Sequence, residues 1–364
     1  MITPSDHPNA SYAAAGVDIA AGEEAVERLK PYAAKASRPE VLGGIGGFAG
    51  LFELKLDRWS EPVLASSTDG VGTKLAVARA LDVHDTVGID LVAMVVDDLV
   101  VCGAEPLFLQ DYIAVGKVVP EQVAQLVKGI AEGCVRAGCA LLGGETAEHP
   151  GLMAAGDYDL CATGVGVVEA SKLLGPDRVR PGDVVIAMAA TGLHSNGYSL
   201  ARHVLLDLAK LPLSGHVEEF GRTLGEELLE PTRIYAKDCL ALVAETDVRT
   251  FAHVTGGGLA ANLARVLPPD LTAVLDRRSW TPAPVFAVIA QRGRIERGDM
   301  EQTFNMGVGM VAVISAEDSD RALAMLTARH VPAWVLGDVN RTKDLAGLDG
   351  ADQRVVLRGE HPRF

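Results

Sequence analysis

Blocks of apolar residues separated by polar turns run along most of the chain and predict a mixture of strands and helices. Residues 61–67 and 105–116 are short apolar runs bounded by Pro or Gly, which favours strands. Residues 87–104 suit a buried helix, and residues 120–138 have the pattern of an amphipathic helix with Pro120 at its start. Further strands are expected at 139–144 and 158–170.

The second half of the chain repeats this mixed pattern after a polar stretch at 171–183, which we interpret as a domain boundary. Strands and helices mix without a strict βαβ alternation, so we expect an α/β protein of the α+β type rather than one doubly wound sheet. The expected division is an N-terminal domain at 1–171, a C-terminal domain at 172–345, and a polar, poorly packed tail at 346–364.

Length and composition narrow the class of protein. At 364 residues the chain exceeds the size at which a single core usually stops growing, which supports two domains. A net charge of -15 argues against general binding to nucleic acid or to anionic membranes. The five cysteines include no close C-x-x-C pair, and the N-terminus has no signal-peptide pattern, so we expect a reducing, cytoplasmic setting.

Four loops share one construction: an apolar strand ends, small or glycine residues follow, and a polar side chain stands near a helix start. Glycine lets backbone N–H groups approach an anion, so each loop is a candidate phosphate or carboxylate site, although a tight turn explains any single one equally well. Four in one chain indicate an extended binding cleft. The four loops are 67–74 (STDGVGTK), 143–151 (GGETAEHPG), 191–199 (TGLHSNGYS) and 253–262 (HVTGGGLAAN).

Acidic residues in and near these loops suggest a metal. The first loop lacks the glycine spacing of a P-loop and carries Asp69, which would repel a polyphosphate unless a cation lay between them. Mg²⁺ takes one or two carboxylates and fills its shell with water and phosphates, so Asp69, Asp98 and Glu145 are candidate ligands. The alternative is a helix cap for Asp90 and an exposed helix edge for Asp97 and Asp98.

Two further side chains have competing interpretations. Lys74 could contact a phosphate as a point charge, or it could be an ordinary surface lysine. His194 could act as an acid or base or bind a phosphate, or it could be a hydrogen-bonded turn histidine. No serine lies in a G-x-S-x-G elbow, so a Ser-His-Asp hydrolase is not supported.

Taken in order, the loops closely resemble the aminoimidazole ribonucleotide synthetase family, also called phosphoribosylformylglycinamidine cyclo-ligases. The resemblance covers nearly the whole chain and is specific, because related ATP-using enzymes share only fragments of it. It rests on the motifs RPEVLGGIGGF, TDGVGTKL, DTVGIDLVAM, DLVVCGAEPLF, GGETAEHPG, HSNGYSL, PTRIY, HVTGGGL and FNMGVGM.

The resemblance implies a reaction and an assembly. Formylglycinamidine ribonucleotide and ATP would give aminoimidazole ribonucleotide, ADP and phosphate, with Mg²⁺ neutralising the transferring phosphoryl group. The family's subunits form a homodimer in which the N-terminal domains pair their sheets into a barrel. ATP binds near the resulting cleft.

The resemblance also assigns residues. Asp69, Lys74 and His194 would be catalytic, and Asp69, Asp98 and Glu145 would be the metal candidates. The nucleotide would be bound by Lys30, Gly43, Gly44, Gly46, Gly47, Thr68, Asp69, Gly70, Lys74 and Asp98. The substrate side of the cleft would be lined by Gly143, Gly144, Glu145, His194, Ser195, Asn196, Gly197, Thr255, Gly256, Gly257 and Gly258.

Two departures and several alternatives stay open. The chain has Ala13 and Ala14 where the family often has Lys-Asp, and it has Asp97 where Asn is common, which leaves the ligand set uncertain. Selenophosphate synthetase, thiamine-phosphate kinase and formylglycinamidine ribonucleotide synthetase are related alternatives. The first should carry a reactive Cys in its N-terminal glycine loop, whereas the first cysteine here is Cys102. A non-catalytic nucleotide-binding regulator is the alternative from another class.

Overall fold

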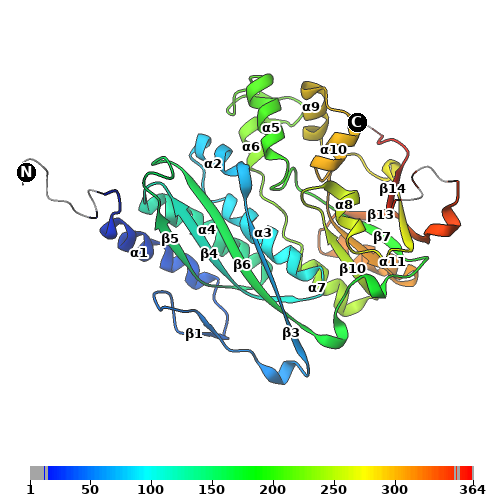
Figure 1. Ribbon diagram of the computed structural model, residues 1–364, viewed down its shortest axis with the longest axis horizontal. Helices are drawn as coiled ribbons and strands as arrows, with labels where there is room; N and C mark the ends of the chain where they lie inside the picture. Colours follow the sequence, from blue (N-terminus) through cyan, green and yellow to red (C-terminus); the bar gives the residue numbers. More distant parts are fainter. Residues whose placement is uncertain (1–11, 13–14, 348–349, 351–352, 363–364) are drawn as a thin grey trace, which may run out of the picture.

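The computed structural model contains two large β-sheets that lie side by side, with helices packed on and between them (Figure 1). It describes residue 12, residues 15–347, residue 350 and residues 353–362. Ala13 and Ala14 lie outside these described residues. Within the described part of the chain, none of the helices combines the length and the apolar character needed to cross a membrane.

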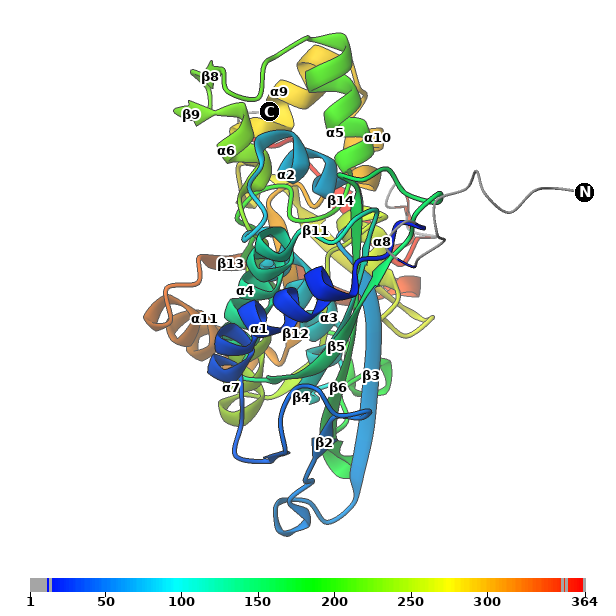
Figure 2. The same ribbon diagram turned by 90° about the vertical axis from the view of Figure 1, so that its left-hand side faces the viewer.

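The N-terminal sheet has four strands in the order β3-β6-β4-β5, antiparallel except for the parallel β4–β5 pair. Helices on one side of this sheet form a single layer (Figure 2). The other side is open: on β4, Leu109 and Ile113 are buried, whereas Gln110 and Tyr112 are exposed. This alternation follows from the two-residue period of a strand with one covered face. The strands are β3 (Pro62–Gly70), β4 (Glu105–Val115), β5 (Ala140–Glu148) and β6 (Tyr158–Glu169), and the helices are α1 (Ile19–Lys35), α2 (Leu75–Leu81), α3 (Val87–Val100) and α4 (Pro120–Ala137).

A glycine-rich loop follows α1 and closes one edge of this layer. It connects two short paired strands, β1 (Val41–Leu42) and β2 (Leu51–Phe52). Gly43 and Gly46 have φ values of 86° and 111°, a region that favours glycine. The loop therefore has a defined path that depends on its glycines.

The C-terminal sheet has six strands in the order β10-β12-β7-β13-β11-β14, and both of its faces are covered. On β7, Val185 and Ala187 pack with α8 on one side, while Ile186 and Met188 belong to the core under the helices of the other side. The strands are β7 (Val184–Ala189), β10 (Val248–His253), β11 (Leu271–Asp276), β12 (Val308–Ile314), β13 (Ala333–Arg341) and β14 (Val355–Arg358). The helices are α5 (Tyr198–Arg202), α6 (Leu224–Leu229), α7 (Ala236–Glu245), α8 (Gly258–Ala264), α9 (Pro284–Gly293), α10 (Arg297–Thr303) and α11 (Ser319–Ala328), and the short strands β8 (His216–Val217) and β9 (Arg222–Thr223) form a separate hairpin.

The predicted helix and strand types are confirmed for most of these elements, and three differences matter. Strand β5 continues through Glu148, so the GGETAE segment is part of a sheet edge and not a free loop. In the second half, the apolar stretch at 198–208 is an α-helix only as far as Arg202, and the rest is a π-helical turn. The tail is not loosely packed, because Val355–Arg358 pairs in parallel with β11 and buries Val355 and Val356.

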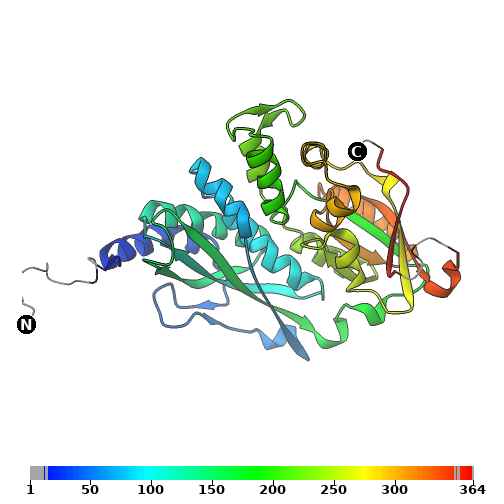
Figure 3. The ribbon, with the colours of Figure 1, turned by 45° about the horizontal axis from the view of Figure 1, so that its top comes forward.

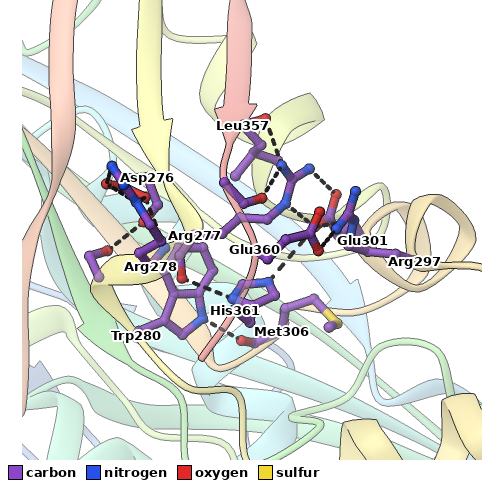
Figure 4. A network of polar contacts seen from close by, with 12 residues as sticks. Asp276, Arg277, Arg278, Trp280, Arg297, Glu301, Met306, Leu357, Glu360 and His361 are labelled. Carbon is purple, nitrogen blue, oxygen red and sulfur yellow. Dashed lines mark hydrogen bonds and ion pairs between the residues drawn. The ribbon is translucent and has the colours of Figure 1, made fainter. Parts of the chain in front are cut away.

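Polar contacts hold the end of the chain against the C-terminal sheet (Figure 4). Arg277 binds Glu301 through two hydrogen bonds of 2.6 and 2.8 Å and also donates to the carbonyl of Leu357. The ring of His361 packs edge-on against Trp280, with centroids 4.4 Å apart, and donates from Nδ1 to the carbonyl of Arg277. These buried contacts complete the edge that the sequence pattern left unassigned.

Helix α3 lies between the two domains and contacts both of them (Figure 3). It packs on β3 and β6 of its own sheet and also contacts α7 and β10 of the other domain. Thirteen of its fourteen residues are buried, which explains its unusually apolar sequence. The one exposed residue is Asp98.

Candidate active site

Three of the four predicted loops meet where the domains face each other. Thr73, in the short 3₁₀ helix after β3, lies with its hydroxyl 3.1 Å from that of Ser199 at the start of α5. Asp98 of α3 accepts a 2.9 Å hydrogen bond from His253 Nδ1 at the end of β10. The first, third and fourth loops thus form one inter-domain site.

Two carboxylates, Asp69 and Asp98, stand at this site. Asp69 Oδ1 accepts from the backbone N–H of Gly70 at 2.7 Å, and the side chain of Asp98 is 45% exposed. Burial, with the nearby negative charge of Asp98, raises the pKa of Asp69, while Gly70 and His253 oppose the shift. The two negative charges therefore repel each other, and a bound cation would relieve this repulsion.

His253 is the site residue that sequence reasoning missed. Burial lowers its pKa, but the hydrogen bond to Asp98 and the negative charges of Asp97, Asp98 and Asp69 outweigh burial and raise the pKa above the ordinary value. Its Nε2 is buried and has no hydrogen-bond partner. The only sequence signal was its place immediately before the TGGG loop, directly after an apolar strand.

The residues present suit a magnesium ion at Asp69 and Asp98. No group of three or more His, Cys, Asp or Glu side chains among the described residues could hold a metal alone. Mg²⁺ does not require such a cage, because it usually takes one or two carboxylates and completes its shell with water and phosphate oxygens. Two partly accessible carboxylates without an arginine or lysine partner match that donor set.

Glu145 does not join this pair within one subunit. Asp69, Ala162, Asp111 and Gly144 lie in one row across the sheet, which puts Asp69 and Gly144 about 14 Å apart at the ~4.8 Å spacing of neighbouring strands. Glu145, next to Gly144, projects from the opposite face of the sheet because successive residues alternate. One ion cannot contact both groups in a single chain.

Two acidic residues of α3 differ from their predicted surroundings. Asp90 is not a helix cap: it is fully buried, and its Oδ1 accepts from Lys74 Nζ at 2.9 Å and from the amide and hydroxyl of Thr232 at 2.8 and 2.6 Å. Asp97 is not on an exposed edge, because its Oδ1 accepts from the Tyr235 amide, its Oδ2 has no partner, and burial raises its pKa to about 7. Asp98, not Asp97, is therefore the carboxylate that faces the cleft.

Lys74 is buried and fully bonded, so it is not the ordinary surface lysine of one sequence interpretation. Its ammonium donates to Asp90 Oδ1, to the carbonyl of His194 at 3.2 Å and to the carbonyl of Glu230 at 2.7 Å. With no exposed surface, all three of its hydrogens are used. In this arrangement it joins the domains, and its contact with a phosphate stays a prediction.

His194 has the geometry of a turn histidine. Its φ is 62°, its side chain is buried, and its Nε2 accepts a 3.1 Å hydrogen bond from the Thr191 amide. Burial, followed by the positive charges of His253, Lys74 and Arg233, holds its pKa well below the ordinary value. The ring is neutral at pH 7, and its buried Nδ1 carries the proton and lacks an acceptor. A catalytic role for this group stays a prediction.

In the third and fourth loops, two glycines are required by close packing, and the backbone of the TGGG loop is held by hydrogen bonds. A Cβ on Gly197 would come 2.3 Å from the ring of Phe304, and one on Gly258 would come 1.8 Å from the carbonyl of Glu301. Asn262 donates to the carbonyls of Thr255, Gly256 and Gly258, which fixes the TGGG loop. Ser195 contacts the Thr232 hydroxyl at 3.4 Å, and Asn196 lies near Met94.

The other predicted nucleotide residues form a second site at the far edge of the N-terminal sheet. Lys30, Gly43 and Gly44 line a cavity of about 390 Å³, and Gly46 and Gly47 line an adjoining cavity of about 350 Å³. Gly143–Glu145, which were predicted for the substrate side, line this second cavity as well. Lys30 is exposed and paired with Glu27. The predicted cofactor set is thus divided between two edges of the sheet, with Thr68, Asp69, Gly70 and Asp98 at the other edge.

Comparisons with known proteins agree with these motifs. Residues 51–168 match the family described as AIR synthase related protein, N-terminal domain, and residues 180–349 match its C-terminal domain. Relatives named phosphoribosylformylglycinamidine cyclo-ligase include those of Anaeromyxobacter dehalogenans, 56% identical over 90% of this chain and 95% of the relative, and of Geobacillus sp., 48% identical over 94% and 99%.

Solved structures share the fold at low identity. Thiamine-monophosphate kinase from Stenotrophomonas maltophilia superimposes with a TM-score of 0.64 at 19% identity, covering 93% of this chain and 96% of that one. The hydrogenase maturation protein HypE in complex with ATP gives 0.62 at 18% identity, covering 91% and 90%. The motifs, the family matches and the full-length relatives together place this chain in the phosphoribosylformylglycinamidine cyclo-ligase family.

Proposed function

We propose that the protein closes the imidazole ring of aminoimidazole ribonucleotide in purine biosynthesis, using ATP and formylglycinamidine ribonucleotide. The observation that carries this proposal is the 56% identity to a phosphoribosylformylglycinamidine cyclo-ligase over 90% of this chain and 95% of that relative. The cytoplasm is the expected compartment of such a pathway.

The chemistry requires activation of a poor leaving group. The formyl oxygen attacks the γ-phosphorus of ATP and releases ADP, and an amidine nitrogen of the same molecule then attacks the formyl carbon, loses a proton and expels phosphate. Holding both ends of one substrate in reactive geometry supplies much of the rate in such intramolecular steps. The opposed loops around Thr73 and Ser199, contributed by different domains, provide walls for that arrangement.

Asp69 and Asp98 would hold Mg²⁺, which would neutralise charge on the transferring phosphoryl group. His253 would hold Asp98 in place through its 2.9 Å hydrogen bond. The TGGG loop, with its carbonyls engaged by Asn262, leaves exposed Gly256 and Gly257 able to approach a polar substrate group closely.

A homodimer would reunite the divided site. The carboxylate pair lies at the β3 edge of the sheet and the glycine-lined cavities at the β5 edge, so pairing of two sheets into a barrel can bring one subunit's carboxylates beside its partner's glycine loop. The open face of the sheet supports such pairing, because Leu64 is 61% exposed and Tyr112 is 40% exposed there.

The decisive experiment combines purified protein, formylglycinamidine ribonucleotide, ATP and Mg²⁺, and follows ADP and the aminoimidazole product together. Equal amounts of both products that depend on the substrate are expected. ADP release without ring closure would point instead to another ATP-using member of the superfamily. Nucleotide binding without any turnover would favour a non-catalytic regulator.

A further inference from the structure

Asp111 is an aspartate within β4 that has no role in the reaction proposed above. It lies in the middle of β4 on the helix-covered face and forms part of the 350 Å³ cavity between α1, the glycine loop and β5. The predicted nucleotide residues Gly46 and Gly47 line the same cavity, together with Gly143 and Gly144, which were predicted for the substrate side of the cleft. Sequence reasoning passed over this aspartate because it lies within a strand.

The carboxyl group of Asp111 is largely buried, and one of its oxygens has no partner. Its Oδ2 is shielded from solvent and has no hydrogen-bond partner, and no described Lys, Arg or His side chain forms an ion pair with it. Burial raises the pKa of this carboxyl to about 7. Buried polar groups are normally satisfied, so an unsatisfied one beside a cavity indicates a hydrogen bond that a ligand completes.

The neighbouring strand is adapted to this carboxyl. A Cβ on Gly144 would come 1.7 Å from Asp111 Oδ1 and 2.8 Å from Cγ, so any larger residue there would displace the group. Gly144 has no positive φ that would otherwise require glycine. The glycine therefore leaves room for the carboxyl at the cavity wall.

The rest of the cavity wall selects the kind of ligand. Apolar side chains, among them Val26, Leu29, Ile113 and Leu141, supply most of the lining. The adjoining cavity shares Ile45 and Leu141 and contains the cationic Lys30 with Gly43 and Gly44. A flat, apolar base with one amino donor fits the first cavity, and the charged end of the same nucleotide fits the second. The ribose phosphate of the other substrate matches these apolar walls poorly.

We propose that the adenine ring of ATP occupies the cavity at Asp111 and that its exocyclic amino group donates a hydrogen bond to the Asp111 carboxyl. This inference rests on the proposed use of ATP and adds the residue that recognises the base. The bond adds a partner to a carboxyl that forms no ion pair with the described Lys, Arg and His side chains.

The test compares equilibrium binding of ATP with that of purine riboside triphosphate, which differs only in lacking the 6-amino group, using calorimetry in the absence of the other substrate. The wild-type protein is expected to prefer ATP by roughly tenfold to a hundredfold, as for loss of a hydrogen bond to a charged group. In Asp111→Ala, ATP affinity should fall by that factor while affinity for the analogue stays unchanged. Asp320→Ala, an exposed acid on α11, is the matched control and should keep the preference.

Equal binding of the two nucleotides by the wild-type protein would overturn the inference without any variant. So would an Asp111→Ala protein that weakens both nucleotides equally, since that result would give the carboxyl a structural role. If the wild-type enzyme closes the ring but shows no preference for the amino group, only the assignment of Asp111 fails. If it binds neither nucleotide, the proposed function fails with it.

Discussion

Asp69 lies at the end of β3, near enough to Asp98 for the charge of that carboxylate to raise its pKa. Replacing Asp69 by Asn removes metal charge but no packing, so we expect ring closure to fall by at least a hundredfold while the fold is kept. Turnover should be measured across a Mg²⁺ titration, with circular dichroism as the check on folding. The exposed-site variant Asp320→Asn should behave as wild type. Near-normal turnover of Asp69→Asn at saturating Mg²⁺ would remove Asp69 from the ligand set.

His194 makes the free energy of unfolding depend on pH, and its buried surroundings set the sign of that dependence. Its pKa is held well below that of an unfolded histidine, about 6.5, so the native state binds fewer protons than the unfolded state. Its contribution to stability is complete above pH 6.5 and is lost as the pH falls below that value, at up to about 1.4 kcal/mol per pH unit. Urea unfolding between pH 7.5 and 5.5 should show a shallower slope for His194→Asn, whose side chain tolerates the positive φ. Identical slopes would contradict the burial of a neutral ring. The same variant should lose turnover if the predicted catalytic role holds.

Lys74 forms a buried ion pair with Asp90. Lys74→Met leaves Asp90 as a buried charge without its cation, which typically destabilises by about 3–5 kcal/mol. Urea unfolding should show this loss, and adding Asp90→Asn should recover part of it because the uncompensated charge is removed. A loss below about 1 kcal/mol for the single variant would mean that the pair is not buried as described.

At the scale of elements, the C-terminal segment adds a strand to the sheet and is tied to α10 through Arg277. Val355–Arg358 completes the sheet beside β11, and Arg277 joins the segment to Glu301 of α10. A chain ending at residue 354 would expose the edge of β11 and remove an acceptor of Arg277, so we expect a lower melting temperature and weaker amide protection in β11 (Figure 4). Replacing only Glu360, which pairs with Arg297 at the surface, should have little effect. Unchanged hydrogen exchange of the β11 amides after truncation would mean that β14 does not stabilise the edge of the sheet.

At the scale of the whole molecule, the divided site predicts that activity depends on assembly. Leu64→Glu on the open face of the N-terminal sheet should yield a monomer in light scattering and abolish ring closure, because one subunit alone separates its carboxylates from its glycine loop. The same substitution on a surface outside the interface, such as Leu208→Glu, should leave a dimer with normal turnover. An active Leu64→Glu monomer would mean that each subunit holds a complete site.

The sequence by itself determined the elements and the chemistry of the loops. Apolar periodicity gave most helices and strands because it records local burial, and the order of the loop motifs indicated the family because those residues meet ligands directly. The same local signals could not reveal β14. This strand has only four residues, its neighbours in sequence are polar, and it is held in place by pairing with β11.

Only the tertiary structure decided which polar groups face the cleft and which are buried. Asp97 and Asp98 are adjacent in sequence, yet one lies against Tyr235 and the other faces His253, because α3 is enclosed by two domains. Glu145 is set apart from Asp69 by the strand order, and Asp111 becomes a candidate base-binding residue because α1 and the glycine loop leave a cavity over it. Burial and proximity of these groups depend on contacts between distant segments, which no local pattern records.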